Sequence, residues 1–159
     1  MALGKTTEQS STYVEYNATK AVDGYDSQKL SDCAHTGIYP KQNVAWWQVD
    51  IGEISEIKNI KIYYRDEGTI RRFDGFQLYS GENKQWMDKD QCYRDTEDGY
   101  SPSVVTVNCP GLAQYITIVN DPKVVARVSM GYSVINDALA FVIIQDVIQT
   151  PVVALKVFM

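Results

Sequence analysis

The feature that most constrains the fold is a two-residue alternation of apolar and polar side chains, repeated in short segments. Between residues 46 and 52, Trp47, Val49 and Ile51 alternate with Gln48 and Asp50. The same period recurs in residues 60–64, 76–79, 105–107 and 116–118. Successive side chains of a strand point to opposite faces, so this period indicates β-strands with one buried face.

Turn-forming residues separate these segments. Asp23-Gly24, Gly81-Glu82-Asn83 and Cys109-Pro110-Gly111 are typical turn sequences, and Gly52 is expected to end the tryptophan strand. No window before residue 130 shows a helical period of apolar residues. We therefore predict an all-β, antiparallel sandwich or barrel. Its predicted core consists of Trp47, Val49, Ile60, Ile62, Phe76, Leu78, Ile116 and Ile118.

The 159 residues are enough for one domain with its own core, and no linker or repeat divides them, so we expect a single domain over 1–159. The last part, residues 140–159, is strongly apolar. Polar residues and Pro151 interrupt this part, which argues against a membrane helix of about twenty apolar residues. We expect a closing strand around Leu139–Ile144, followed by a second hydrophobic segment.

Charge and motif content exclude several classes of function. A net charge of −5 argues against nucleic acid and against an anionic membrane as the main partner, because both need a basic patch. The sequence contains no nucleophile elbow, no phosphate loop and no evident pair of facing carboxylates, so we expect a protein that is not an enzyme. With His35 as the single histidine, soft ligands are too few for a zinc site.

The cysteines and the N-terminal region bear on the compartment. Three cysteines suggest one disulfide and one remaining thiol if the compartment is oxidising. Asn17-Ala18-Thr19 is a glycosylation sequon, and Met1 runs into the chain without a basic and apolar leader. We expect a secreted, extracellular protein whose leader precedes this sequence; the alternative is a cytoplasmic protein.

Six motifs between residues 2 and 120 occur in the order found in one known family. They are Ala2–Lys5 with Gln9–Ser11, Ala21–Gly24, Cys33–Thr36, Trp46–Gly52, Ile60–Asp66 and Phe73–Tyr79. This ordered set resembles the fucolectins, or F-type lectins, of the discoidin and coagulation-factor C-type superfamily. The resemblance implies a discoidin-like jelly-roll β-sandwich that binds carbohydrate.

The resemblance also implies a fucose site made by one histidine and two arginines. His35 stands in a Cys-x-His-Thr motif, and Arg65 and Arg72 are spaced as the family requires, with Glu67 at its acidic position. The spacer after His35 is longer than usual, and Gly68-Thr69 replaces an adjacent cysteine pair. The alternative is that both arginines are solvated strand ends.

The chemistry of these side chains suits a neutral sugar. Arginine presents several N–H donors in a rigid fork, and charged donors form the stronger hydrogen bonds to hydroxyl and ring oxygens. The apolar face and methyl group of fucose need an apolar wall, for which Tyr39 is a candidate.

The family binds a structural calcium ion, which the resemblance places at the Asp23 carboxylate, the main-chain oxygens of Lys20 and Tyr25, and Asp32. The family completes this site from its C-terminal strand with a cysteine followed by glutamate, where this sequence has Ala140 and Phe141. One carboxylate and the disulfide partner of Cys33 are therefore missing, and we expect Cys33 to be a free thiol. The alternative for Asp23 is an ordinary turn residue before Gly24.

The resemblance implies a disulfide between Cys92 and Cys109. It also implies fucosylated glycans or glycoproteins as partners, in innate immunity or cell adhesion, and leaves open whether a homo-oligomer forms. The main alternative is a discoidin-like adhesion module that binds protein or lipid without sugar specificity. A weaker alternative is a carbohydrate-targeting module of a larger enzyme.

Overall fold

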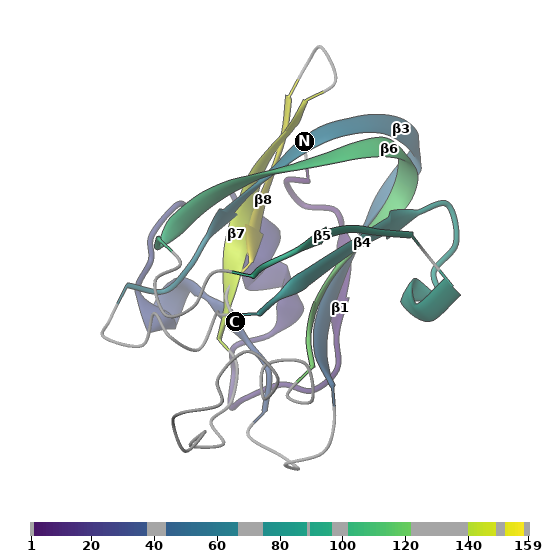
Figure 1. Cartoon of the computed structure of the whole chain (residues 1–159). Coiled ribbons are helices and arrows are strands. Elements are labelled where there is room, and N and C mark those ends of the chain that lie inside the picture. Colours follow the sequence, from purple (N-terminus) through teal and green to yellow (C-terminus); the bar gives the residue numbers. More distant parts are fainter. Residues whose placement is uncertain are drawn as a thin grey trace.

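The computed structural model describes residues 2–37, 44–66, 75–88, 90–96, 102–121, 140–148 and 152–157. These ranges contain eight strands and three short 3-10 helices (Figure 1). The strands are β1 (Thr6–Gln9), β2 (Ala34–His35), β3 (Ala45–Tyr63), β4 (Gln77–Gly81), β5 (Asp90–Arg94), β6 (Val104–Asn120), β7 (Ala140–Ile148) and β8 (Val152–Val157). The 3-10 helices are η1 (Ala18–Val22), η2 (Leu30–Asp32) and η4 (Trp86–Asp88).

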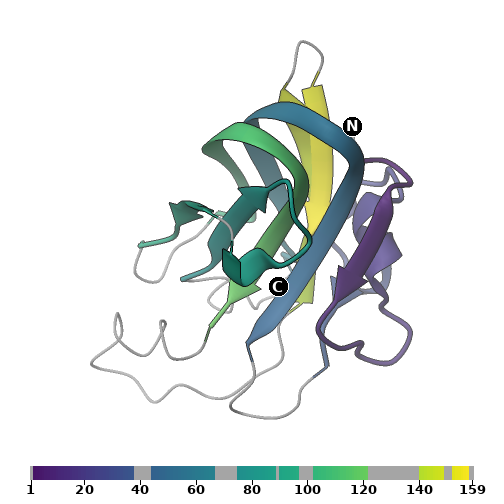
Figure 2. The ribbon, with the colours of Figure 1, turned by 90° about the vertical axis from the view of Figure 1, so that its right-hand side faces the viewer.

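Two long antiparallel strands, β3 and β6, connect the two layers of the sandwich. In the first layer, the first part of β3 pairs with β1 and with the second part of β6, which in turn pairs with β4 (Figure 2). In the second layer, the second part of β3 pairs with the first part of β6 and with β7. Both strands curve strongly between these parts (Figure 1), so each contributes to both layers.

The prediction that Gly52 ends a strand and that Cys109-Pro110-Gly111 forms a turn is wrong. Both sites lie within the continuous strands β3 and β6, where the pairing register shifts between Asp50 and Ser55 and between Ile57 and Asn59. Gly52 has a φ of +90°, which glycine adopts without a side-chain clash. Irregularities of this kind bend a strand without ending it, and here they produce the curvature.

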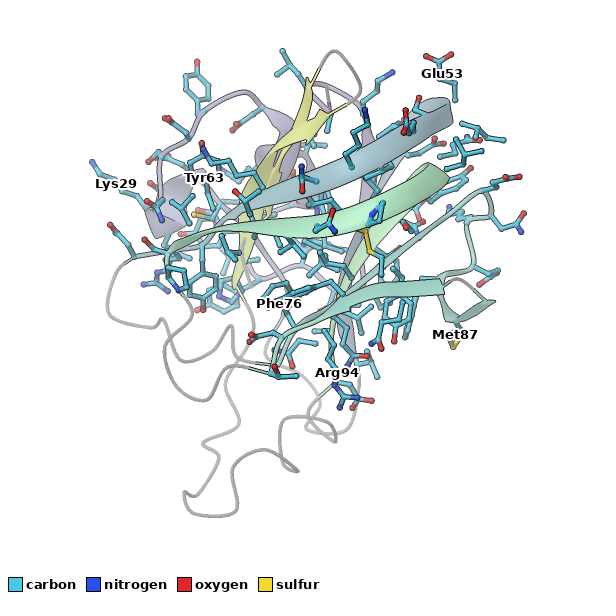
Figure 3. The ribbon with its side chains drawn as sticks, turned by 45° about the horizontal axis from the view of Figure 1, so that its top comes forward. Lys29, Glu53, Tyr63, Phe76, Met87 and Arg94 are labelled. Atoms are coloured by element: carbon cyan, nitrogen blue, oxygen red, sulfur yellow. A yellow bond between two sulfur atoms is a disulfide. The ribbon has the colours of Figure 1, made fainter. Side chains whose placement is uncertain are left out.

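The eight residues predicted for the core are all fully buried, which confirms the predicted strand register. Phe76 illustrates the arrangement, since its ring points between the layers in Figure 3, whereas Glu53 lies on the outer bend of β3. Trp47 also donates from its indole Nε1 to the main-chain oxygen of Ala18, at 3.1 Å. This bond anchors η1 to the first layer.

The C-terminal segment forms two strands, as expected for its first part. β7 pairs on one side with β3 and on the other with β2 and β8. Cys92 of β5 and Cys109 of β6 form a disulfide, the pairing that the resemblance implied. Cys33 is buried and not part of this disulfide, as expected. Within the described ranges, no helix is long and apolar enough to cross a membrane.

Candidate functional site

His35 lies in the short strand β2 and is buried, with 4% of its surface exposed. Its Nδ1 lies 2.6 Å from the main-chain oxygen of Thr36. Because a carbonyl oxygen can only accept, Nδ1 carries the proton of this bond, and in the neutral ring Nε2 carries the lone pair. The ring also packs on Tyr13, with centroids 4.9 Å apart.

An N-terminal turn holds the main chain of His35. The amide of Tyr13 donates to the oxygen of His35, and the amide of His35 donates to the oxygen of Tyr16, both at 2.9 Å. Gln9 donates to the same oxygen of His35 at 3.2 Å. The structure thus places His35 in a strand beside Tyr13 and Tyr16, with its main chain held by hydrogen bonds.

Arg65 is half-buried and follows the last residue of β3 by two positions. Gln28 holds this strand end. Its side-chain amide donates to the main-chain oxygens of Tyr64 and Ser103, the latter at 2.9 Å, and its main-chain oxygen accepts from the amide of Asp66 at 3.3 Å. The main chain on both sides of Arg65 is therefore held by one residue from the loop before η2.

Strand register brings His35 and Arg65 to the two flanks of β7. His35 is paired with Ala140 on one side of β7, and Tyr63 is paired with Ile143 on the other. Because β3 and β7 are antiparallel, the two residues from Tyr63 to Arg65 run back toward Ala140. Two strand spacings of about 4.8 Å separate the flanks, so the main chains of His35 and Arg65 lie on the order of 10 Å apart. Arg72, Glu67 and Tyr39 lie outside the described residues.

The loop expected to bind calcium is held together by protein groups. The Lys20 ammonium donates to the main-chain oxygen of Ser31 at 2.7 Å. Both carboxylate oxygens of Asp32 accept from serine hydroxyls, those of Ser27 at 2.6 Å and Ser31 at 3.0 Å. Asp23 accepts from the Tyr25 amide at 2.9 Å, as a turn residue does. A cationic side chain thus already bridges η1 and η2.

These residues do not fit a calcium site well. Calcium takes about six to eight oxygen ligands, and β7 offers Ala140 and Phe141 opposite His35 and Ala34, where no carboxylate is available. Among the described residues, no three His, Cys, Asp or Glu side chains gather closely enough to hold a metal ion. The thiol of Cys33 instead donates to the main-chain oxygen of Lys29.

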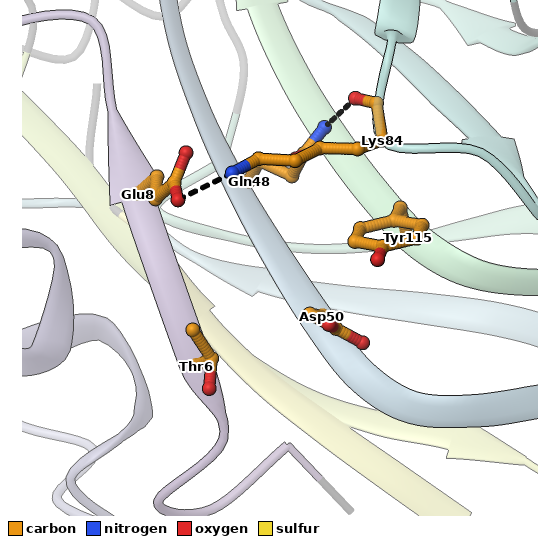
Figure 4. A pocket seen from close by; sticks show the side chains of 6 residues that line it. All are labelled: Thr6, Glu8, Gln48, Asp50, Lys84 and Tyr115. Carbon is orange, nitrogen blue, oxygen red and sulfur yellow. Dashed lines mark hydrogen bonds and ion pairs between the residues drawn. The ribbon is translucent and has the colours of Figure 1, made fainter.

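A polar groove that the sequence did not predict lies on the outer face of the first layer (Figure 4). It encloses about 90 Å³ and is lined by Thr6, Glu8, Gln48, Asp50, Lys84 and Tyr115. The alternation of Gln48 and Asp50 with the apolar positions of β3 was visible in the sequence. Their partners from β1, β6 and the turn after β4 were not, because pairing between distant strands brings them together.

Comparison with known proteins identifies the fold and the family. The model of the NedA-like, galactose-binding domain family, of F5/F8 type C, matches residues 20–118. No curated protein sequence matches the chain closely enough to define a relative.

Solved structures of lectin modules share the fold. The lectin domain of lectinolysin complexed with Lewis B antigen is 23% identical, over 99% of this chain and 94% of that chain, with a TM-score of 0.66. A fucose-binding module of Streptococcus pneumoniae is 20% identical, over 99% and 92%, with a TM-score of 0.66. A fucolectin from the serum of striped bass, Morone saxatilis, is 19% identical, over 99% of this chain and 47% of that chain, with a TM-score of 0.69. These likenesses confirm the predicted all-β, discoidin-like sandwich. Because the family model also covers more than half of the residues, the chain belongs to the NedA-like, galactose-binding domain family of F5/F8 type C domains.

Proposed function

We propose that this chain is a non-enzymatic lectin that binds terminal fucose on glycans through His35, Arg65 and Arg72. The observation that supports the proposal is the pairing of β2 and β3 with β7, in which the main chains of His35 and Arg65 lie near the same end of β7, on its two flanks. Thirty residues separate the two in sequence, so only the fold relates them. The fucose-binding modules among the structural neighbours support the same ligand class.

The fixed main chains suit a binding role. Gln28 holds the main chain beside Arg65, and the turn from Tyr13 to Tyr16 holds His35. Preorganised donors lose little freedom on binding, so a neutral sugar can gain affinity from few contacts. A guanidinium then supplies charged donors to the sugar oxygens, and Arg72 supplies the second fork in this proposal.

We extend the proposal to the setting of the protein. The Cys92–Cys109 disulfide is of a kind that persists in oxidising compartments, which supports secretion and glycan partners outside the cell. Defence or adhesion through cell-surface fucose is the corresponding biological role.

Arginine substitutions test the proposal. Binding of methyl α-L-fucoside is measured by calorimetry for the wild type and for Arg65→Ala and Arg72→Ala. Each lost charged donor should cost about 1.5–3 kcal/mol, which weakens binding at least about tenfold. Arg94→Ala, on the exposed edge strand β5 (Figure 3), is the matched control and should bind as the wild type does.

The contradicting result is equally specific. If both site variants bind fucoside as well as Arg94→Ala does, the arginines are not ligands and the site is wrong. If the folded wild type ignores fucoside and instead binds protein or lipid vesicles, the adhesion-module alternative replaces the lectin.

A further inference from the structure

We infer that the polar groove on the outer face of the first layer is a second sugar site, which takes one edge of a neutral sugar residue. The inference rests on the proposed function in taking sugar as the ligand class. It concerns a different surface from that of His35 and Arg65, so the protein would bind sugar at two separate places.

Strand pairing arranges the side chains of the groove in two rows. Thr6, Asp50 and Tyr115 form one row across β1, β3 and β6, because Thr6 pairs with Asp50 and Asp50 with Tyr115. Glu8 and Gln48 pair in the adjacent row. The next strand, β4, has Gly81 opposite Tyr115, so it adds no side chain beside the tyrosine ring.

The turn after β4 closes one side of the groove. The buried Gln48 donates from Nε2 to the main-chain oxygen of Lys84 at 2.9 Å and to Thr117 Oγ1 at 2.7 Å. The Lys84 ammonium crosses to Glu8 Oε1 at 2.6 Å (Figure 4), although the two side chains stay 58% and 48% exposed. The floor is therefore rigid, while the charged groups at the rim are accessible to a ligand.

The groove offers polar groups that can bind a pair of sugar hydroxyls, and an aromatic ring on which the apolar face of the sugar can pack. Carboxylates accept from vicinal hydroxyls, and the Lys84 ammonium has three N–H donors, of which Glu8 takes one. The tyrosine ring offers the flat apolar surface on which sugar C–H groups pack. A volume of about 90 Å³ has room for a few water molecules, so one edge of a pyranose fits and the rest stays in solvent.

The charge balance selects a neutral ligand. Glu8 and Lys84 neutralise one another, and Asp50 accepts from Gln114 Nε2 at 3.0 Å and from the Gly52 amide at 2.7 Å. Burial raises the pKa of Asp50, but these bonds and the Tyr115 hydroxyl outweigh burial and hold that pKa below its ordinary value. The Asp50 carboxylate therefore stays ionised at neutral pH and repels sulfated or sialylated sugars.

The groove and the His35 site lie on opposite faces of β1. Thr6 and Glu8 line the groove, whereas Gln9, which alternates with them, donates to the main-chain oxygen of His35 at 3.2 Å. A sugar in one site therefore does not occupy the other, and the two can be disabled separately.

Nuclear magnetic resonance titration tests the groove directly. The reporters are the side-chain amides of Gln48 and Gln114 and the main-chain amide of Gly52, all of which bond to groove residues. Methyl β-D-galactoside, methyl α-L-fucoside and methyl β-D-glucoside are the neutral probes, and galactose 6-sulfate is the anionic one. At least one neutral probe should shift these signals saturably, in the wild type and in Arg65→Ala. Its dissociation constant should be at least fivefold lower than that of galactose 6-sulfate.

Variants in the groove complete the test. Tyr115→Ala should weaken binding of the neutral probe at least tenfold, and Lys84→Ala should weaken it at least threefold. Lys84→Ala should fold normally because the Lys84 side chain is exposed. Lys58→Ala is the matched control, since Lys58 forms an ion pair with Glu56 at 4.0 Å elsewhere on β3. It should respond as the wild type does.

The outcomes separate the two proposals. Shifts confined to amides near His35 and Arg65 overturn the groove and leave the fucose site standing. Shifts at the groove reporters without a response near His35 support the groove and count against the fucose site. Tighter binding of the sulfate, or equal responses in Lys84→Ala and Lys58→Ala, overturns the groove.

Discussion

Gln28→Glu tests whether one side chain holds the strand end that carries Arg65. In the wild type the Gln28 amide donates two hydrogen bonds, to the main-chain oxygens of Tyr64 and Ser103. A glutamate of the same shape donates none when ionised and one when protonated. The substitution therefore changes donor capacity while the volume of the side chain stays the same.

The magnitude follows from the two bonds. Each contributes about 0.5–1.5 kcal/mol, and an ionised carboxylate facing two carbonyl oxygens adds repulsion, so the cost near neutral pH is about 2–4 kcal/mol. Protonation restores one bond and reduces the cost to about 1 kcal/mol. The pKa of the introduced carboxyl group in the folded variant must then exceed the ordinary glutamate value of about 4.3 by about one to two units.

The stability of the Gln28→Glu variant should depend on pH in a defined direction. Because the folded state binds this proton more tightly than the unfolded state, the stability it contributes is complete below about pH 4.3 and is lost as pH rises through the folded pKa. Urea unfolding, followed by tryptophan fluorescence between about pH 4 and pH 8, measures this against the wild type. Gln28→Ala, which loses both bonds without adding a titrating group, is the control with a pH-independent deficit.

Two results would refute the reasoning. One is a deficit of Gln28→Glu that does not change with pH, which would mean that the carboxylate turns to solvent. The other is a Gln28→Ala variant as stable as the wild type, since the two bonds would then contribute nothing.

Three further expectations follow from the described contacts. Trp47→Phe removes the bond to Ala18 and leaves space in the core, so it should lower the free energy of unfolding by about 2–3 kcal/mol. Trp86→Phe, at a partly exposed position, is the control and should lower it by less than half as much. Equal losses in the two variants would contradict the assigned core. Peptide mapping without reduction should recover the Cys92–Cys109 link, and Cys33 should react with thiol reagents only after unfolding; fast labelling of the native protein would contradict its burial. Because Lys20 already bridges η1 and η2, calcium and chelator should leave the melting temperature unchanged while Lys20→Met lowers it; a clear rise with calcium would show that the metal binds after all.

The sequence predicted the strand faces because burial follows a local period. Trp47 and Val49 in one layer and Ile60 and Ile62 in the other are all fully buried, as the alternation indicates. It did not distinguish a turn from a bend within a strand. Gly52 has the local chemistry of a strand end, yet β6 runs alongside β3 on both sides of it, and only this pairing partner decides that the strand continues.

The residues of the candidate site could be proposed from the sequence, but the residues that surround them in the fold could not. The resemblance selected His35 and Arg65, and strand register relates them, but the burial of His35 comes from Tyr13 and Tyr16 in a distant turn. The groove was missed for the same reason. Its residues are ordinary polar positions of separate strands, and their shared surface arises from the pairing of β1, β3 and β6.

The most direct test of the fucose site is a titration of the isotope-labelled wild type with methyl α-L-fucoside, followed by main-chain amide shifts. We predict saturable shifts at Thr36, Gly37, Arg65 and Asp66, with a dissociation constant of about 1 mM or below, equivalent to about 4 kcal/mol. These four amides adjoin His35 or Arg65 on the two flanks of β7. Unchanged amides at these positions in about 10 mM fucoside, in a protein that remains folded, would contradict the fucose site.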